Sequence, residues 1–324
     1  LERPDIISFA GGIPDPALFP ADAYRAAFAD ALAGDGAGAA LQYSVSEGHR
    51  SLRDWIAGEM AALGIPCDAD NILITSGSQQ ALDYLGKLMI SPKDTALVGW
   101  PTYLGALGAF NAYEPRYARL DPLGNRDAAQ IRAEAEAAGG RVKCAYLSAD
   151  FANPTGITIG RAGRGALIDL ADALDIAIIE DAAYQTLRYD GEAIPPILAL
   201  EIARKGSVEA CRTIYSGSFS KSLAPGLRVG WVCAAKPVIG RLVLLKQAAD
   251  LHSPTINQIV TDIVARLVFT SHVARLRKAG LDVDARTLFS QPTLAQLAAK
   301  TAAQAPRVEA PQTAIPQLNR RRRI

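Results

Sequence analysis

The chain has 324 residues, of which 49% are hydrophobic and 21% are charged, and its formal net charge is +1. A chain of this length can bury a sizeable core and can hold one large domain with a smaller part beside it. The nearly neutral charge gives no general attraction to nucleic acid or to a membrane surface, and no apolar run reaches the roughly 18 residues that a membrane span needs.

Metal sites, disulfides and secretion signals are also disfavoured by the sequence. The four cysteines have no CxxC spacing, and the three histidines form no cluster. These patterns argue against a disulfide framework, a zinc site or a catalytic metal, and they predict reduced, mostly buried thiols. The N-terminus lacks the charged start, apolar stretch and cleavage site of a signal peptide, so the expected location is the cytoplasm.

Apolar runs rich in β-branched residues predict strands at 71–75, 95–99, 114–120, 143–148, 176–180, 212–216 and 228–234. Amphipathic stretches between them predict helices near 78–90, 103–112, 127–139 and 161–174, followed by a long helix near 236–269. This alternation indicates βα units and therefore an α/β fold, with a seven-stranded, mostly parallel sheet and helices on both faces. A sheet covered on both faces also explains why residues 176–179 are all apolar.

Residues that follow the strands are candidates for a site, because ligands of such sheets bind at the carboxyl ends of the strands. Strand 71–75 is followed by Ser76-Gly77-Ser78-Gln79 and then by a predicted helix. Small residues there let backbone N–H groups at the helix N-terminus face an anion such as phosphate. By itself the same stretch also fits a capped helix start with Ser78 as the N-cap.

Two ionisable residues stand just after strands. Asp181 follows strand 176–180, and a carboxylate buried there needs a cationic partner, which a protonated pyridine nitrogen would supply. The segment Ser218-Phe219-Ser220-Lys221 follows strand 212–216. A lysine among small and apolar residues can have a lowered pKa and act as an amine nucleophile toward an aldehyde. Taken singly, the aspartate also fits a helix cap and the lysine a surface turn.

Further candidate contacts follow other strands. Arg228 comes soon after Pro225-Gly226 and carries a planar guanidinium that suits a phosphate. Asn153, in an Asn-Pro-Thr-Gly turn, can donate to a phenolate oxygen, and Tyr184 can reach the same oxygen. Tyr103 can lie over an aromatic ring. The set as a whole is improbable as a chance outcome of structural requirements alone.

In this order along the chain, these residues resemble the class I/II aminotransferases of fold-type I, which use pyridoxal 5′-phosphate. The matching segments, within about 6–270, are Phe9-Ala10-Gly11-Gly12-Ile13-Pro14, Gln42-Tyr43, Glu47-Gly48, Ser76-Gly77-Ser78-Gln79, Pro101-Thr102-Tyr103, Asn153-Pro154-Thr155-Gly156, Glu180-Asp181-Ala182-Ala183-Tyr184, Ser218-Phe219-Ser220-Lys221 and Pro225-Gly226-Leu227-Arg228. The sequence around residues 11–20 and 43–53 is most similar to the branch of this family that contains 2-aminoadipate aminotransferases and the aminotransferase-like domains of certain transcription regulators.

The resemblance implies a role for each matching residue in binding pyridoxal 5′-phosphate. Lys221 would form the internal aldimine and move the proton between Cα and C4′, and Asp181 would pair with the pyridine nitrogen. Asn153 and Tyr184 would hold the ring hydroxyl oxygen, and Tyr103 would stack on the ring. The phosphate cup would consist of Ser76, Gly77, Ser78, Gln79, Ser218, Ser220 and Arg228.

The resemblance also implies a partner subunit and a reaction. Tyr43 would reach the phosphate of the neighbouring subunit in a homodimer, and Gly12 would lie near the substrate carboxylate. The reaction would be transamination, a step of amino-acid metabolism that moves an amino group between an amino acid and a 2-oxo acid. Two alternatives stay open: other pyridoxal-phosphate chemistry, such as decarboxylation or a lyase reaction, and a non-catalytic binding module on the same fold.

The expected organisation has four parts: an N-terminal arm and small-domain segment at 1–40, a cofactor-binding large domain at 41–270, a helical segment at 271–300, and a linker or disordered tail at 301–324. Residues 273–300 resemble the last helices of a peptidyl-carrier domain of a nonribosomal peptide synthetase, which hints at a link to a peptide assembly line. No C-terminal small domain with a substrate-binding arginine is recognised, so cofactor binding is expected to survive better than transamination.

Overall fold

The structure is a computed structural model that describes residues 12–122, 124, 127–188 and 191–278. Its strands form one sheet in the order β1-β7-β6-β5-β4-β2-β3. Their bounds are β1 (Ile72–Thr75), β2 (Thr95–Gly99), β3 (Arg116–Leu120), β4 (Val142–Leu147), β5 (Ala177–Asp181), β6 (Thr213–Ser218) and β7 (Gly230–Cys233). Strand β7 runs antiparallel to β1 and β6, and the other neighbours run parallel. The predicted seven-stranded, mostly parallel sheet is confirmed.

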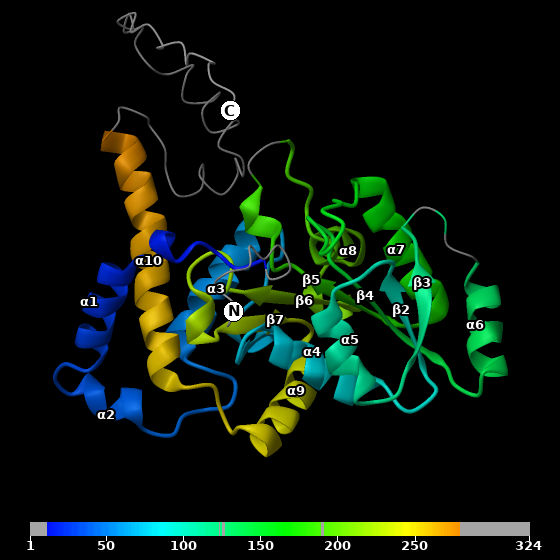
Figure 1. Ribbon diagram of the computed structural model, residues 1–324, viewed down its shortest axis with the longest axis horizontal. Coiled ribbons are helices and arrows are strands. Elements are labelled where there is room, and N and C mark those ends of the chain that lie inside the picture. The colour runs from blue at the N-terminus through cyan, green and yellow to red at the C-terminus, as the bar shows by residue number, and fades with distance from the viewer. Residues whose placement is uncertain (1–11, 123, 125–126, 189–190, 279–324) are drawn as a thin grey trace, which may run out of the picture.

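Helices cover both faces of this sheet (Figure 1). One face carries α4 (Ser78–Met89), α5 (Leu104–Asn111) and α9 (Lys236–Ala249), and their apolar side chains form one core with those of the central strands. The other face carries α3 (Arg50–Ala62), α6 (Ala128–Ala137), α7 (Arg161–Leu174) and α8 (Ile197–Lys205). Beside α3 lie α1 (Ala21–Ala31), α2 (Gly36–Leu41) and α10 (Thr255–Lys278), which pack together.

The predicted long helix near 236–269 is wrong, because the chain forms two helices there, α9 and α10. Leu251 takes up a left-handed backbone with φ of 62°, which a right-handed helix cannot contain. Pro254 then disfavours helical backbone at the residue before it. The break brings Asp250 and Ser253 to the N-terminal end of α4, as described below. The other predicted helices match α4, α5, α6 and α7, and residues 279–324 lie outside the described residues.

The described part of the chain contains neither a membrane-spanning helix nor a cluster of metal-binding side chains. Its helices are too short or too polar to span a membrane. It also contains no group of three or more His, Cys, Asp or Glu side chains that could hold a metal ion. Its four cysteines are free thiols, with Cys144 and Cys233 buried and Cys67 and Cys211 half-buried.

Neighbouring carboxylates of β5 lie on opposite faces of the sheet, as the alternation of a strand requires. The Glu180 carboxylate is buried and accepts hydrogen bonds from the backbone N–H groups of Ile197 (2.8 Å) and Leu198 (3.1 Å) at the start of α8. It therefore fastens α8 to the sheet, while Asp181 is left free to face the opposite side. Burial raises the pKa of Glu180 to about 7.

Replacing Glu180 by glutamine should change the pH dependence of stability. Because the folded pKa of Glu180 exceeds its ordinary value of 4.5, the folded protein holds this proton more tightly than the unfolded chain does. The stability contributed by Glu180 is therefore full below pH 4.5 and is lost as the pH rises through about 7. Relative to wild type, the free energy of unfolding of Glu180→Gln should increase over this interval in urea titrations.

Glu201→Gln is a matched control with the opposite sign. Burial alone would raise the pKa of Glu201, but hydrogen bonds from Lys205, Thr213 and Arg212 outweigh burial and lower it. Its stabilising contribution is thus present above the unfolded pKa and is lost as the pH falls through the folded one. Relative to wild type, Glu201→Gln should lose stability as the pH rises toward 4.5. If the free energy of unfolding, relative to wild type, changed with pH in the same direction for both variants, the opposite pKa shifts assigned to Glu180 and Glu201 would be contradicted.

Candidate active site

A cavity of about 200 Å³ lies where the carboxyl ends of β5 and β6 approach the N-terminus of α4. Its lining residues are Ser78, Gln79, Tyr103, Ser148, Asn153, Asp181, Ala183, Tyr184, Ser218, Ser220, Lys221, Pro225 and Arg228. All of these except Ser148, Ala183 and Pro225 are residues that the sequence predicts for the site. The fold thus collects side chains from six separate stretches of the chain, as expected for residues that follow neighbouring strands.

Lys221 lies three residues beyond β6 and directs its amine into this cavity. Its Nζ donates a hydrogen bond to the backbone oxygen of Gly12 (2.7 Å) and lies 5.6 Å from the centre of the Tyr184 ring. Burial lowers the pKa of Lys221, which increases the fraction of neutral, nucleophilic amine. Gly12 is also close to the Tyr184 hydroxyl, since a Cβ on Gly12 would lie 3.6 Å from that oxygen.

Asp181 is the last residue of β5, and its carboxylate is buried. Its Oδ2 accepts a hydrogen bond from the Tyr146 hydroxyl (2.8 Å), and its Oδ1 accepts one from the backbone N–H of Ala183 (3.3 Å). Burial raises the pKa of Asp181. Both of these donors are neutral, so the carboxylate retains the capacity to pair with a cation in the cavity.

Tyr146, a residue of β4, is a site component that sequence reasoning missed. Its side chain is fully buried and packs edge-on against Phe110, which is typical of a core residue. The available signal is chemical, because a buried tyrosine hydroxyl usually needs a hydrogen-bond partner. Only the pairing of β4 with β5 brings that hydroxyl to Asp181.

An anion site is formed at the start of α4. Gly77, with φ of 79°, is the N-cap, so the helix begins at Ser78 and the alternative of Ser78 as N-cap is wrong. The Arg228 guanidinium lies over Gly77, where a Cβ would overlap it, and donates to the Ser76 backbone oxygen (3.3 Å) and to Ser220 Oγ (3.4 Å). The unpaired N–H groups of the first turn and this guanidinium together favour a phosphate.

Of the remaining predicted residues, some line the cavity and one does not. Burial raises the pKa of Tyr184, and the Asn153 side chain next to it lowers that pKa by less. Gln79 donates its amide to the backbone oxygen of Gly105 (2.6 Å), so it also braces α5. Tyr43 is 78% exposed, lies against His252 and does not line the cavity. Its predicted contact with a neighbouring subunit stays a prediction.

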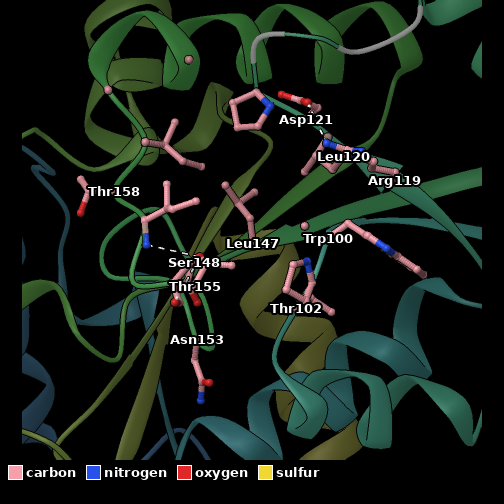
Figure 2. A pocket seen from close by; sticks show the side chains of 18 of the residues that line it. Trp100, Thr102, Arg119, Leu120, Asp121, Leu147, Ser148, Asn153, Thr155 and Thr158 are labelled. Atoms are coloured by element: carbon pink, nitrogen blue, oxygen red, sulfur yellow. Dashed lines mark hydrogen bonds and ion pairs between the residues drawn. The ribbon is translucent and has the colours of Figure 1, made fainter.

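A second, larger cavity of about 420 Å³ adjoins the first (Figure 2). Its lining includes the apolar side chains of Leu120, Leu147 and Ile157, while Ser148 and Asn153 line both cavities. In Figure 2 the Asn153 side chain points away from this larger space. Its amide therefore serves the smaller cavity, where Tyr184 lies.

Comparison with known proteins identifies the family of the chain. The family model for class I and II aminotransferases matches residues 4–322. The chain belongs to this family. It is 40% identical to aromatic-amino-acid aminotransferase 1 of Thermococcus litoralis over 80% of its own length and 62% of that protein's. It is 38% identical to 2-aminoadipate transaminase of Thermus thermophilus, covering 86% of this chain and 67% of that one.

A solved aminotransferase has a similar structure. The kynurenine aminotransferase of Pyrococcus horikoshii, solved with pyridoxamine phosphate and kynurenine, matches with a TM-score of 0.72 and 37% identity, over 85% of this chain and 67% of its own. Pyridoxal phosphate is therefore the cofactor of the family to which this chain belongs. The chain spans 62% and 67% of the length of the two curated relatives. Nothing in these matches supports the predicted link to a peptide assembly line.

Proposed function

We propose that this chain is a pyridoxal-phosphate-dependent aminotransferase that moves an amino group between an amino acid and a 2-oxo acid. One observation carries the proposal: Lys221, Asp181 and Arg228 line a single cavity at the N-terminus of α4. These groups fit, respectively, an aldehyde, a pyridine nitrogen and a phosphate. The buried carboxylate of Asp181, whose two hydrogen-bond donors among the described residues are both neutral, is the feature that fits a protonated pyridine best.

The cofactor, when bound, would supply an aldehyde that condenses with amines and a ring that withdraws electrons from the substrate Cα. Lys221 would hold and move the proton that leaves Cα, and its lowered pKa suits both the uptake and the release of that proton. Asp181 would keep the ring nitrogen protonated. Asn153 and Tyr184 would hold the ring hydroxyl oxygen, and Tyr103 would lie against the ring.

The anion site and its surroundings orient the cofactor and the substrate. Arg228, Ser218 and Ser220 would hold the phosphate together with the segment Ser76-Gly77-Ser78-Gln79. Gly12 would lie near the substrate carboxylate, since its backbone oxygen already contacts Lys221 Nζ. Fixing the phosphate, the ring and the carboxylate restricts the substrate to one orientation, and orientation decides which bond at Cα breaks.

We further propose a cytoplasmic homodimer in which residues 41–270 form the cofactor-binding domain. The exposure of Tyr43 supports the homodimer, because the side chain lies outside its own chain's cavity and is accessible to a neighbouring subunit. Leu104, which follows the ring-stacking Tyr103, is 79% exposed and adds an apolar side chain for such a contact.

A spectral screen tests the proposed reaction. Purified protein loaded with pyridoxal phosphate is mixed in turn with aromatic, acidic and aliphatic amino acids. Transamination predicts conversion of the cofactor to pyridoxamine phosphate together with one equivalent of 2-oxo acid, and a second 2-oxo acid should reverse the change. Release of carbon dioxide or ammonia without pyridoxamine phosphate would replace transamination by decarboxylase or lyase chemistry.

A further inference from the structure

Lys246, in α9, is fully buried although it carries a charge. Its Nζ lies within hydrogen-bond distance of Gln80 Oε1 (2.9 Å), both oxygens of Asp250 (3.0 Å each) and Ser253 Oγ (3.0 Å). Taking an ammonium group out of water is costly unless it is paired and hydrogen-bonded. Lys246, Asp250, Gln80 and Ser253 form a connected group, which we call the Lys246 network.

The Lys246 network converges on Ser76, the first residue of the anion site. The Ser76 backbone N–H donates to Gln80 Oε1 (2.9 Å), and its hydroxyl lies 3.0 Å from Ser253 Oγ and 3.4 Å from Asp250 Oδ2. Asp250 Oδ2 also accepts from Gln80 Nε2 (2.7 Å). The Ser76 backbone oxygen is held by Arg228 on the other side. Every polar group of Ser76 thus has a partner, and most of these partners belong to the network.

The position of Ser76 decides where the following N–H groups point. Ser78, two residues further on, carries the first N–H group of α4, while the Gly77 N–H donates to the backbone oxygen of Thr75 (2.8 Å). A shift of the Ser76 backbone would move Ser78 and turn the N–H groups of the first turn away from the place where they meet a phosphate. The distance between such a donor and the phosphate oxygen must stay within a few tenths of an ångström of its best value for a charge-assisted hydrogen bond to keep its strength.

We propose that Lys246 and Asp250 are positioning residues for the cofactor phosphate, acting through Gln80 and Ser253 on Ser76. This inference rests on the proposed function, because it takes the anion at the start of α4 to be that phosphate. The Asp250 carboxylate by itself would repel an anion. Its role beside the site is therefore to position Ser76 and not to attract the phosphate. Lys246 neutralises the carboxylate and fixes its orientation.

The test compares Lys246→Met and Asp250→Asn in cofactor-free protein. Equilibrium titrations measure the dissociation constants of pyridoxal phosphate and of inorganic phosphate, and titrations with pyridoxal, which lacks the phosphate, provide the reference. If the network positions Ser76, both variants should bind pyridoxal phosphate and inorganic phosphate about tenfold more weakly, or worse, and should bind pyridoxal as wild type does. Tighter phosphate binding by Asp250→Asn would mean that charge alone matters, and would overturn the proposal.

Lys205→Met is the matched control. Like Lys246, Lys205 is an ion-paired lysine, but it pairs with two carboxylates, Glu201 (2.8 Å) and Asp172 (2.6 Å), and it belongs to the opposite face of the sheet. This variant should lose stability without losing affinity for pyridoxal phosphate. Should Lys246→Met not fold, Asp250→Asn and Gln80→Leu carry the test, since the Asp250 side chain is 29% exposed. Unchanged affinity in folded variants, or equal weakening in Lys205→Met, would refute the role.

The result is distinguishable from a failure of the proposed function. Wild-type protein that binds inorganic phosphate but not pyridoxal phosphate would contradict the cofactor assignment while the network could still govern the anion site. Wild-type protein that binds pyridoxal phosphate, with variants that bind it equally well, would leave the function standing and remove the network's role.

Discussion

Lys221→Ala should lose all covalent attachment of pyridoxal phosphate. In the wild-type protein the Lys221 amine lies in the cavity with a pKa lowered by burial, so it is able to condense with the cofactor aldehyde. Alanine removes that amine and leaves Asp181 and Arg228 in place. Borohydride reduction followed by peptide mass spectrometry should find the cofactor on the peptide with Lys221 in wild type and on no peptide of the variant.

Binding without a covalent bond should survive in Lys221→Ala, because the phosphate and ring contacts are unchanged. Lys236→Ala serves as the control, since Lys236 is an exposed lysine that pairs with Asp68 (2.7 Å) and lies outside the cavity. It should retain the full covalent yield. Reduced cofactor trapped on another lysine of Lys221→Ala, in wild-type yield, would refute the assignment of Lys221.

Asp181→Asn should slow the amino-acid-dependent conversion of the cofactor by on the order of 10²- to 10⁴-fold, because breaking a buried ion pair costs about 3–5 kcal/mol and each 1.36 kcal/mol is a factor of ten. Asparagine keeps the size of the side chain and can still accept from Tyr146, but it lacks the charge that holds a proton on the pyridine nitrogen. Stopped-flow absorbance with a single amino acid measures the rate.

Tyr146→Phe is the graded companion to Asp181→Asn. It removes one donor to the carboxylate but leaves its charge, so the loss of rate should be smaller. The Tyr146 hydroxyl also lowers the pKa of Asp181 against the stronger effect of burial. Its removal should therefore raise that pKa and shift the acidic limb of the pH–rate profile upward. An equal loss of rate in both variants, with no shift of the profile, would mean that Tyr146 acts only through packing.

Much of the site could be predicted from local sequence. Strands covered on both faces are apolar throughout, so their ends are marked by the first polar residues, and parallel neighbours bring those ends to one edge. For this reason the sequence alone predicts that Asp181, Lys221 and Asn153 lie in one cavity, as they do. The helices that follow strands, such as α4, could also be predicted from the sequence. Their apolar periodicity and the glycine or small residues at their starts are local features.

Other features were decided only by tertiary structure. The long helix near 236–269 has a helical pattern throughout, but the chain breaks between α9 and α10, which lets Asp250 reach Ser76 across 174 positions of sequence. Tyr146 likewise looks like a core residue until β4 pairs with β5.

The sequence by itself determined which candidate cofactor-binding groups lie at the strand ends, because side-chain chemistry and strand boundaries are local properties. Tertiary structure decided which residues hold those groups in place, as Tyr146 holds Asp181 and Lys246 supports Ser76. The physical reason is that a hydrogen bond needs its two atoms within a few tenths of an ångström of the correct separation, and distant segments reach that accuracy only through the packing of the whole fold.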